Sequence, residues 1–296
     1  MRQIILSCVV AILGFSLMTS MPVYGQSSKK ILFAVLEDGK RIEPIGFLLS
    51  GKFVSSGEGK DPGMGGEVTP YLAAGKTYSI IFGGSANGST KVVKQITGEC
   101  AGKSAEVTST PTSATLKGYV MAVATDGTFT LKTPAVRRLP SDTERAAVEK
   151  LVREEFTKQK VPSSALNTLN YLNLTAIDLE RNGNADLVGT YWVAPSESQR
   201  ALLYVVVEMD SSKNYKLTYS EFDDYSQEEV MSGNIKDIDT GIYHNLMLDY
   251  VDIDADGIGE IVNTAQAFEG RNFSVLKREG GYWNKIHESY NYRCGF

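Results

Sequence analysis

The sequence predicts a mainly β protein with one linking helix, and three observations carry that prediction. Short apolar runs rich in β-branched residues alternate with glycine turns over 26–140 and again over 163–296, as in antiparallel sheets. Between them, residues 141–162 hold a single apolar stripe at helical spacing. The second β region also repeats itself. We therefore expect an N-terminal β-sandwich or barrel-like domain, a linking helix, and a C-terminal pair of four-stranded antiparallel, blade-like repeats.

Residues 1–25 have the composition of a secretory signal peptide. Arg2 precedes an apolar run over 4–17, and the compact Val23 and small Gly25 suit cleavage after Gly25. An uncleaved anchor is the alternative, although the run is short for a bilayer span of about 20 residues. We expect an extracytoplasmic protein, periplasmic or secreted, with no membrane span after cleavage.

The N-terminal β region, 26–140, contains three hairpin signals. Asp38-Gly39, Asn87-Gly88 and Asp126-Gly127 each lie between strand-like runs, and such dipeptides favour tight hairpin turns. The runs beside Asp126-Gly127 predict strands over 116–124 and 128–132. The glycine-rich stretch 51–70 has no periodicity, which predicts a loop. Short strands at this spacing favour a small sandwich or barrel.

The linking helix has a clear start and end. Ser141 and Glu144 have the spacing of a capping box, in which each side chain bonds the backbone of the other residue. Val148, Val152 and Phe156 then recur at helical spacing, and Pro162 ends the pattern. We expect this helix to separate the two β regions.

The C-terminal region holds two copies of one pattern, over about 166–227 and 242–296. Asp178 aligns with Asp252 at an offset of 74 residues, and the later strands align at an offset of 69. Residues 223–240 between the copies predict a polar linker with a helical turn. Repeated units bury a face against each other, so we expect two sheets packed face to face or a partial propeller backed by the helix.

The loop that begins at Asp252 has the composition of a site for a hard cation. Four carboxylates stand at its positions 1, 3, 5 and 9, and Gly257 at position 6 permits a tight turn. Calcium takes about 6–8 oxygen ligands in flexible geometry, whereas magnesium requires a near-ideal octahedron. We therefore expect calcium, because without a cation the four carboxylates repel one another.

This loop pattern resembles the FG-GAP/VCBS repeats of integrin-α-like propellers, and the resemblance covers about 166–296. An EF-hand does not fit, because position 12 is Gly189 or Asn263 where that motif needs glutamate. In the FG-GAP family a hairpin loop binds calcium through positions 1, 3, 5 and 9 and the carbonyl of position 7. The resemblance implies a second-copy site at Asp252, Asp254, Asp256, the carbonyl of Ile258, and Glu260. It implies a first-copy site at Asp178, Glu180, Asn182, the carbonyl of Asn184, and Asp186.

The two implied sites differ in charge, so we expect one or two calcium ions. The first copy has a longer acid, Glu180, at position 3 and the neutral Asn182 at position 5. Its loop therefore carries three formal charges against four in the second copy, and we expect it to bind calcium more weakly.

Two cysteines, Cys100 and Cys294, remain beyond the signal segment. In an oxidising compartment an even pair can form a disulfide. That bridge would tie the first half of the chain to its C-terminus. Two free buried thiols are the alternative, and the spacing does not decide between them.

Charge and composition narrow the partner class. The chain of 296 residues carries a formal net charge of −5, and an acidic chain argues against nucleic acid, whose binders usually carry a basic patch. A protein or a glycan partner stays open. Six tyrosines of the repeats can form a binding surface or serve as ordinary strand residues: Tyr215, Tyr219, Tyr225, Tyr282, Tyr290 and Tyr292.

No catalytic constellation stands out in the sequence. The two histidines, His244 and His287, lack zinc-ligand spacing. We therefore expect an exported calcium-binding β-repeat protein with a binding or structural role at the cell envelope or outside the cell. The alternative is a secreted hydrolase with a carboxylate or metal site.

Overall fold

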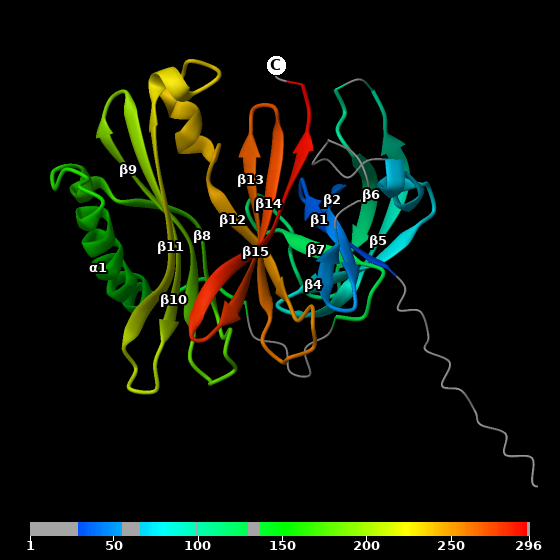
Figure 1. Cartoon of the computed structure of the whole chain (residues 1–296), viewed down its shortest axis with the longest axis horizontal. Helices are drawn as coiled ribbons and strands as arrows, with labels where there is room; N and C mark the ends of the chain where they lie inside the picture. Colours follow the sequence, from blue (N-terminus) through cyan, green and yellow to red (C-terminus); the bar gives the residue numbers. More distant parts are fainter. Residues whose placement is uncertain (1–28, 55–65, 99, 130–136, 295–296) are drawn as a thin grey trace, which may run out of the picture.

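The structure is a computed structural model, and it describes residues 29–54, 66–98, 100–129 and 137–294. Four layers follow one another: helix α1, a first four-stranded sheet, a second four-stranded sheet, and a closed barrel (Figure 1). The predicted mainly β class is confirmed. The predicted signal peptide, 1–25, lies outside the described residues.

The N-terminal sheet closes into a barrel, which is the second of the two predicted forms. Its strands follow the order β1-β7-β4-β5-β6-β2, β1 also pairs with β2, and β3 extends the sheet beyond β2. Apolar side chains such as Phe33, Phe47 and Ile80 fill the interior, together with Val68 and Leu72 from the short helix η1. The bounds are β1 Lys30–Leu36, β2 Arg41–Leu49, β3 Lys52–Val54, η1 Gly66–Leu72, β4 Thr77–Phe82, β5 Ser85–Ile96, β6 Ser104–Thr110 and β7 Ala122–Thr125.

The turn between β4 and β5 differs from the prediction. Phe82 pairs with Ser85 across Gly83 and Gly84, which both have positive φ and so suit a tight turn. Asn87 instead lies inside β5 at a register shift, and its side-chain oxygen accepts the amides of residues 112, 113 and 114 at 3.1 Å. The Asn-Gly signal therefore marks a bulge that anchors the following loop.

Other element boundaries also differ from the prediction. The first hairpin turns at Asp38-Gly39 as expected, but the strand expected over 116–124 begins only at Ala122. Its expected partner over 128–132 is not a strand at 128 and 129, and the rest lies outside the described residues. The expected loop 51–70 contains β3 and the start of η1.

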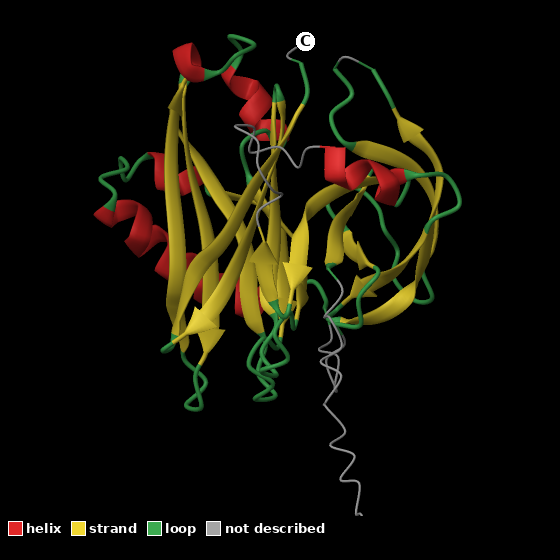
Figure 2. Ribbon diagram, turned by 45° about the vertical axis from the view of Figure 1, so that its right-hand side comes forward, coloured by secondary structure: helices red, strands yellow, loops and turns green. Residues whose placement is uncertain are grey.

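Helix α1 spans Asp142–Lys158, slightly shorter than the expected 141–162, and has the predicted capping box between Ser141 and Glu144. Val148, Val152 and Phe156 are fully buried against the first four-stranded sheet. In Figure 2 the longest helix, α1, lies at the outer left of the strand layers. The apolar stripe thus places α1 on the outer face of that sheet.

Each predicted repeat forms a four-stranded antiparallel sheet, in the orders β11-β10-β9-β8 and β12-β13-β14-β15. The expected linker is shorter than predicted, because β11 continues to Ser226 before two short 3-10 helices. The bounds are η2 Ala165–Thr168, β8 Asn170–Ile177, β9 Asp186–Ser196, β10 Gln199–Met209, β11 Tyr215–Ser226, η3 Gln227–Glu229, η4 Ile235–Thr240, β12 Asn245–Val251, β13 Glu260–Ala267, β14 Gly270–Glu279 and β15 Tyr282–Tyr292.

The two sheets are stacked in series with the same orientation. Tyr204 and Val206 of the first sheet pack against the second sheet. The residues 69 positions later, Phe273 and Val275, pack against the barrel instead. Corresponding faces therefore point the same way, with α1 behind the first sheet and the barrel in front of the second. A symmetric face-to-face sandwich is not formed.

The second sheet is fastened to the barrel by more than apolar contact. Cys100 and Cys294 form a disulfide across a sequence separation of 194 residues, with their Cα atoms 4.8 Å apart. Asn291 of β15 accepts the amide of Lys103 at 2.8 Å and donates to the buried Glu43 at 2.8 Å. The C-terminal strand is thereby tied to the β5–β6 loop and to β2.

Candidate metal centre

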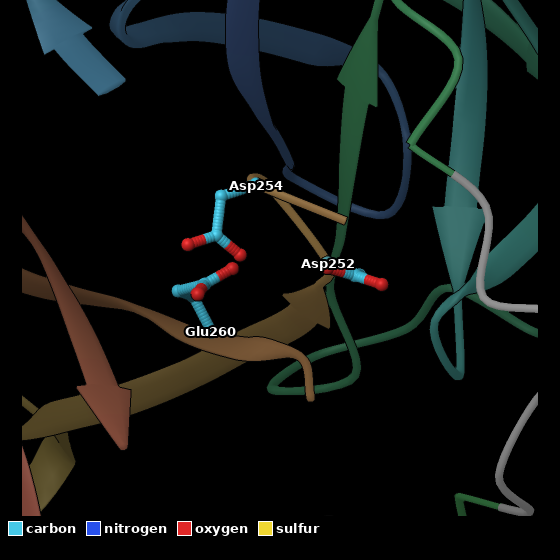
Figure 3. Close-up of side chains that lie close together, drawn as sticks. All are labelled: Asp252, Asp254 and Glu260. Carbon is cyan, nitrogen blue, oxygen red and sulfur yellow. The ribbon is translucent and has the colours of Figure 1, made fainter. Parts of the chain in front are cut away.

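The predicted cation loop of the second copy connects β12 to β13. Asp252 follows the last residue of β12, and Glu260 is the first residue of β13. One oxygen each from Asp252, Asp254 and Glu260 lies within 4.8 Å of the other two. The carboxylates of Asp254 and Glu260 face each other in Figure 3. The structure therefore brings three of the predicted ligands together.

Backbone amides hold these carboxylates in place. Gly257, whose φ is +95°, donates its amide to Asp252 Oδ2 at 3.1 Å. Ile253 donates to Glu260 Oε2 at 2.7 Å, so that the last acid of the loop closes onto its start. Asp252 Oδ1 is buried and has no hydrogen-bond partner among the described residues. One oxygen of the cluster is thus left without compensation.

A lysine that the sequence reasoning missed lies among these acids. Lys277 of β14 places its ammonium 2.5 Å from Asp254 Oδ2, 2.9 Å from Asp256 Oδ2 and 3.2 Å from Glu260 Oε1. Burial opposes the charge of Lys277, but hydrogen bonds to the three carboxylates outweigh burial and raise its pKa. A protein cation therefore lies where three of the four carboxylates converge, and it links Asp256 to the cluster.

The acids of this loop differ in how well their charge is compensated. Burial raises the pKa of Glu260 to about 7, against the opposing effect of the Ile253 amide and Lys277. Burial also raises the pKa of Asp252. The pKa of Asp256 is lowered, because the hydrogen bond from Lys277 and the amide of Ile258 outweigh burial. Burial therefore disfavours the charged forms of Asp252 and Glu260.

The first-copy loop has the same backbone plan. Asp178 accepts the amides of Asn182 and Gly183 at 3.0 and 2.9 Å. The fully buried Asp186 accepts the amide of Leu179 at 2.9 Å, as Glu260 accepts that of Ile253. Burial raises the pKa of Asp186 to about 7. Both copies therefore close the loop with a buried acid.

The cation of the first loop comes from the other sheet. Arg278 of β14 lies 2.5 Å from Glu180 Oε1 and 2.8 Å from Glu208 Oε1. Trp283 of β15 also donates to Glu208 at 2.8 Å. Glu208 occupies the position that Lys277 holds in the second copy, 69 residues later. At this strand position the first copy therefore has an acid and the second copy has a base.

The other residues of the predicted sites make contacts within the loops. Asn182 Nδ2 donates to Glu180 Oε2 at 3.2 Å, and the side-chain oxygen of Asn184 accepts a hydrogen bond from Lys213. Ile258 donates its amide to Asp256 at 2.8 Å. These bonds do not involve the carbonyls of Asn184 and Ile258, which are the predicted ligand atoms. The sequence aligns Lys277 with Glu208 at the offset of 69, but its position beside the loop depends on the register of β14 against β13.

Both histidines are enclosed by structural contacts. His244 is fully buried, with Nε2 2.9 Å from the Ile238 carbonyl oxygen. His287 stacks on Phe53 with ring centroids 3.9 Å apart, and its Nε2 lies 3.0 Å from the Ile45 carbonyl oxygen. Burial lowers the pKa of both imidazoles.

Within the described residues, no helix has the length and apolar character to cross a bilayer. Comparison with protein-family models, curated proteins and solved structures returned no match for this chain.

Proposed function

We propose that this chain is an extracytoplasmic, calcium-stabilised β-repeat protein with a binding or structural role. The convergence of Asp252, Asp254 and Glu260 at the start and end of one hairpin loop carries the proposal. Oxygen atoms of carboxylates are the ligands that calcium prefers. Export is supported by the composition of residues 1–25 and by the disulfide, which suits an oxidising compartment.

The residues of the second loop fit a hard cation. Asp252 supplies a buried oxygen that has no partner among the described residues. Glu260 is 2% exposed, and burial raises its pKa to about 7 despite the opposing effect of Lys277. A bound calcium ion would neutralise these acids and stabilise the β12–β13 hairpin. Asp252, Asp254, Asp256 and Glu260 would hold it through side-chain oxygens.

Lys277 affects how strongly calcium can bind at the proposed site. Its ammonium already compensates three of the four carboxylates, so calcium and Lys277 compete for the same charge. The first loop has Arg278 in a comparable role, held by the buried Glu208 as well as by Glu180. We therefore place the stronger calcium site in the second copy.

The test is thermal unfolding with a chelator and with excess calcium. Binding to the folded state alone stabilises it by about 2.7 kcal/mol at a hundredfold excess over Kd. We expect calcium to raise the melting temperature of the parent but not of the double variant Asp252→Asn, Asp254→Asn. Asp224→Asn with Glu228→Gln is the matched control, because both acids are exposed and lie outside the loops. A parent that calcium does not stabilise contradicts the proposal.

A lysine variant separates the proposed competition from a purely internal ion pair. In chelator, Lys277→Met should melt at a lower temperature than the parent, because the loop loses its cation. In calcium it should show a larger upward shift than the parent. The exposed Lys236→Met serves as the control for loss of one charge. If calcium does not rescue Lys277→Met, the lysine is the cation for which the loop is built.

The hydrolase hypothesis is addressed by the same proteins. A screen of esterase, phosphatase and glycosidase substrates with the parent and the double loop variant tests it directly. Turnover by the parent that is lost in the variant while calcium-induced stabilisation is absent would favour a hydrolase over the binding protein proposed above.

A further inference from the structure

The space between the two sheets is apolar at one end and hollow at the other. Tyr204, Val206, Ile261, Leu276 and Trp283 fill the apolar end. Further along the same strands the packing stops at a cavity of about 160 Å³, between β11 of the first sheet and β13, β14 and β15 of the second. This cavity, the inter-sheet cleft, lies outside both candidate metal loops.

A comparison of the two repeats shows why the cleft is open. In the first sheet, four positions that face α1 carry large apolar side chains, buried in its core: Tyr191, Val193, Leu203 and Val205. The corresponding positions of the second sheet, at the offsets of 74 and 69, are small or polar and line the cleft: Ala265, Ala267, Asn272 and Ser274. The repeat thus has room for a core here, and the second copy does not fill it.

The walls of the cleft carry excess negative charge. Lys285 lies 3.0 Å from Glu221 and 3.5 Å from Glu288, and all three residues line the cleft. The side chain of Asp223, two residues after Glu221 on the same face of β11, makes no hydrogen bond and no ion pair with any described residue. Burial and then the nearby Glu221 raise the pKa of Asp223, against the opposing attraction of Lys285. Three carboxylates are therefore served by one ammonium group.

Two further features of the lining point to an organic ligand. Ser274 is 8% exposed, lines the cleft, and its hydroxyl makes no hydrogen bond with any described residue. The rings of Tyr225 and Tyr243 stack with centroids 4.9 Å apart and also line the cleft. A hydroxyl without a protein partner can bond a ligand in the cleft, and aromatic faces attract cations. The cleft thus offers a hydrogen-bond partner, an aromatic wall and uncompensated charge.

We propose that the inter-sheet cleft binds an organic cation, an amine or guanidinium of about the size of a lysine or arginine side chain. The charged head would pair with Asp223 and Glu288, and its stem would lie along Tyr225. A neutral sugar would leave the excess charge uncompensated. A bare divalent ion would leave the aromatic wall unused. This inference does not depend on calcium at the Asp252 loop.

The test is calorimetric titration of the full chain with agmatine, which carries both a guanidinium and an amine. The parent should bind it saturably. Asp223→Asn should weaken binding about tenfold, as expected for loss of a charged hydrogen-bond partner. Asp224→Asn is the matched control, because Asp224 is the exposed neighbour on the opposite face of β11 and its substitution changes the net charge equally. Its affinity should equal that of the parent at the same ionic strength.

A second variant keeps the test independent of folding defects at Asp223. Ser274→Ala removes one hydroxyl without changing charge and should weaken agmatine binding by a few-fold, with an unchanged melting temperature. Absence of saturable binding by the parent overturns the proposal. Equal weakening in Asp224→Asn and Asp223→Asn also overturns it, because that result indicates attraction by net charge alone. Binding of a neutral disaccharide in preference to agmatine assigns the cleft to glycans instead.

Discussion

The two four-stranded sheets are built from one repeat but are held in different ways. The first sheet is covered on its outer face by α1, through Val148, Val152 and Phe156. The second lies between the first sheet and the barrel and is fastened to the barrel by the Cys100–Cys294 disulfide. Their cation loops also differ, because Lys277 of β14 pairs with the second loop and Arg278 of β14 pairs with the first loop.

Lys277 and Arg278 show how one strand serves both loops. Successive residues of a strand point to opposite faces. Lys277 therefore reaches the loop of its own sheet, whereas Arg278 crosses to Glu180 and Glu208 of the first sheet. The charge of the second loop is balanced within one sheet, and that of the first loop is balanced across the interface. Substitutions of Lys277 and of Arg278 should therefore differ in their effect on stability.

The largest expected effect breaks the covalent fastening of the second sheet. Cys100→Ser with Cys294→Ser should lower the free energy of unfolding by about 4 kcal/mol, because the bridge closes a long loop in the unfolded chain. Urea unfolding measures the loss, and the reduced parent is the control. Hydrogen exchange should accelerate in β15 and leave α1 unchanged. A double variant as stable as the oxidised parent would show that the interface holds without the bridge.

The next effect compares the two loops directly. Arg278→Met should destabilise the protein by about 3 kcal/mol, because it leaves the buried Glu208 without its cation. Lys277→Met, its neighbour, should lose only about 1 kcal/mol in chelator, because two of its three partners, Asp254 and Asp256, are exposed, and the buried Glu260 is the most distant of them at 3.2 Å. Urea unfolding of both variants provides the measurement. Equal losses would contradict the distinction between inter-sheet and within-sheet compensation.

Much of the fold was predictable from local sequence patterns. The capping box at Ser141, the turn at Asp38 and the repeated loops are each specified by a few neighbouring residues, so they are recognisable without the fold. Barrel closure depends on pairing β1 with β2 and with β7, which lies about ninety residues away, and turn signals do not report such pairings. The tight turn forms at Gly83-Gly84 and not at Asn87-Gly88, because both dipeptides suit such a turn and only one of them can form it.

The candidate site was predictable in its loops but not in its counter-charges. Asp252, Asp254 and Glu260 are close in sequence and converge as expected. Lys277 and Arg278 come from a later strand, and which face each occupies depends on the register of β14 against β13. The disulfide partners were named, but only the packing of the second sheet on the barrel brings Cys100 and Cys294 together.

A pH experiment tests a difference between the two copies at the position of His244. Burial lowers the pKa of His244 from 6.5 to about 4, whereas Asn170, the corresponding residue of the first copy, does not titrate. The unfolded chain binds the proton more tightly, so stability from neutral His244 is present above pH 6.5 and is lost as the pH falls toward 4. From pH 7 to pH 5 the loss is about 2 kcal/mol.

The measurement is urea unfolding of the parent and of His244→Asn at both pH values. The variant makes the second copy resemble the first and should lose less stability on acidification. His287 is retained in both proteins, so its own titration cancels in the difference. An identical pH dependence of the two proteins would mean that His244 is protonated without disturbing the junction between the sheets.

The smallest expected effect concerns the cover of the first sheet. Ser141→Ala removes the hydroxyl that accepts the amide of Glu144 at 3.3 Å and frees one donor at the start of α1. The expected loss is about 1 kcal/mol, and the exposed Ser212→Ala is the control. Hydrogen exchange should accelerate in α1 while β12–β15 keep their protection, because those strands are buried between the first sheet and the barrel. Faster exchange throughout β12–β15 would instead show that the two sheets unfold as one unit, and that their different fastenings do not separate them.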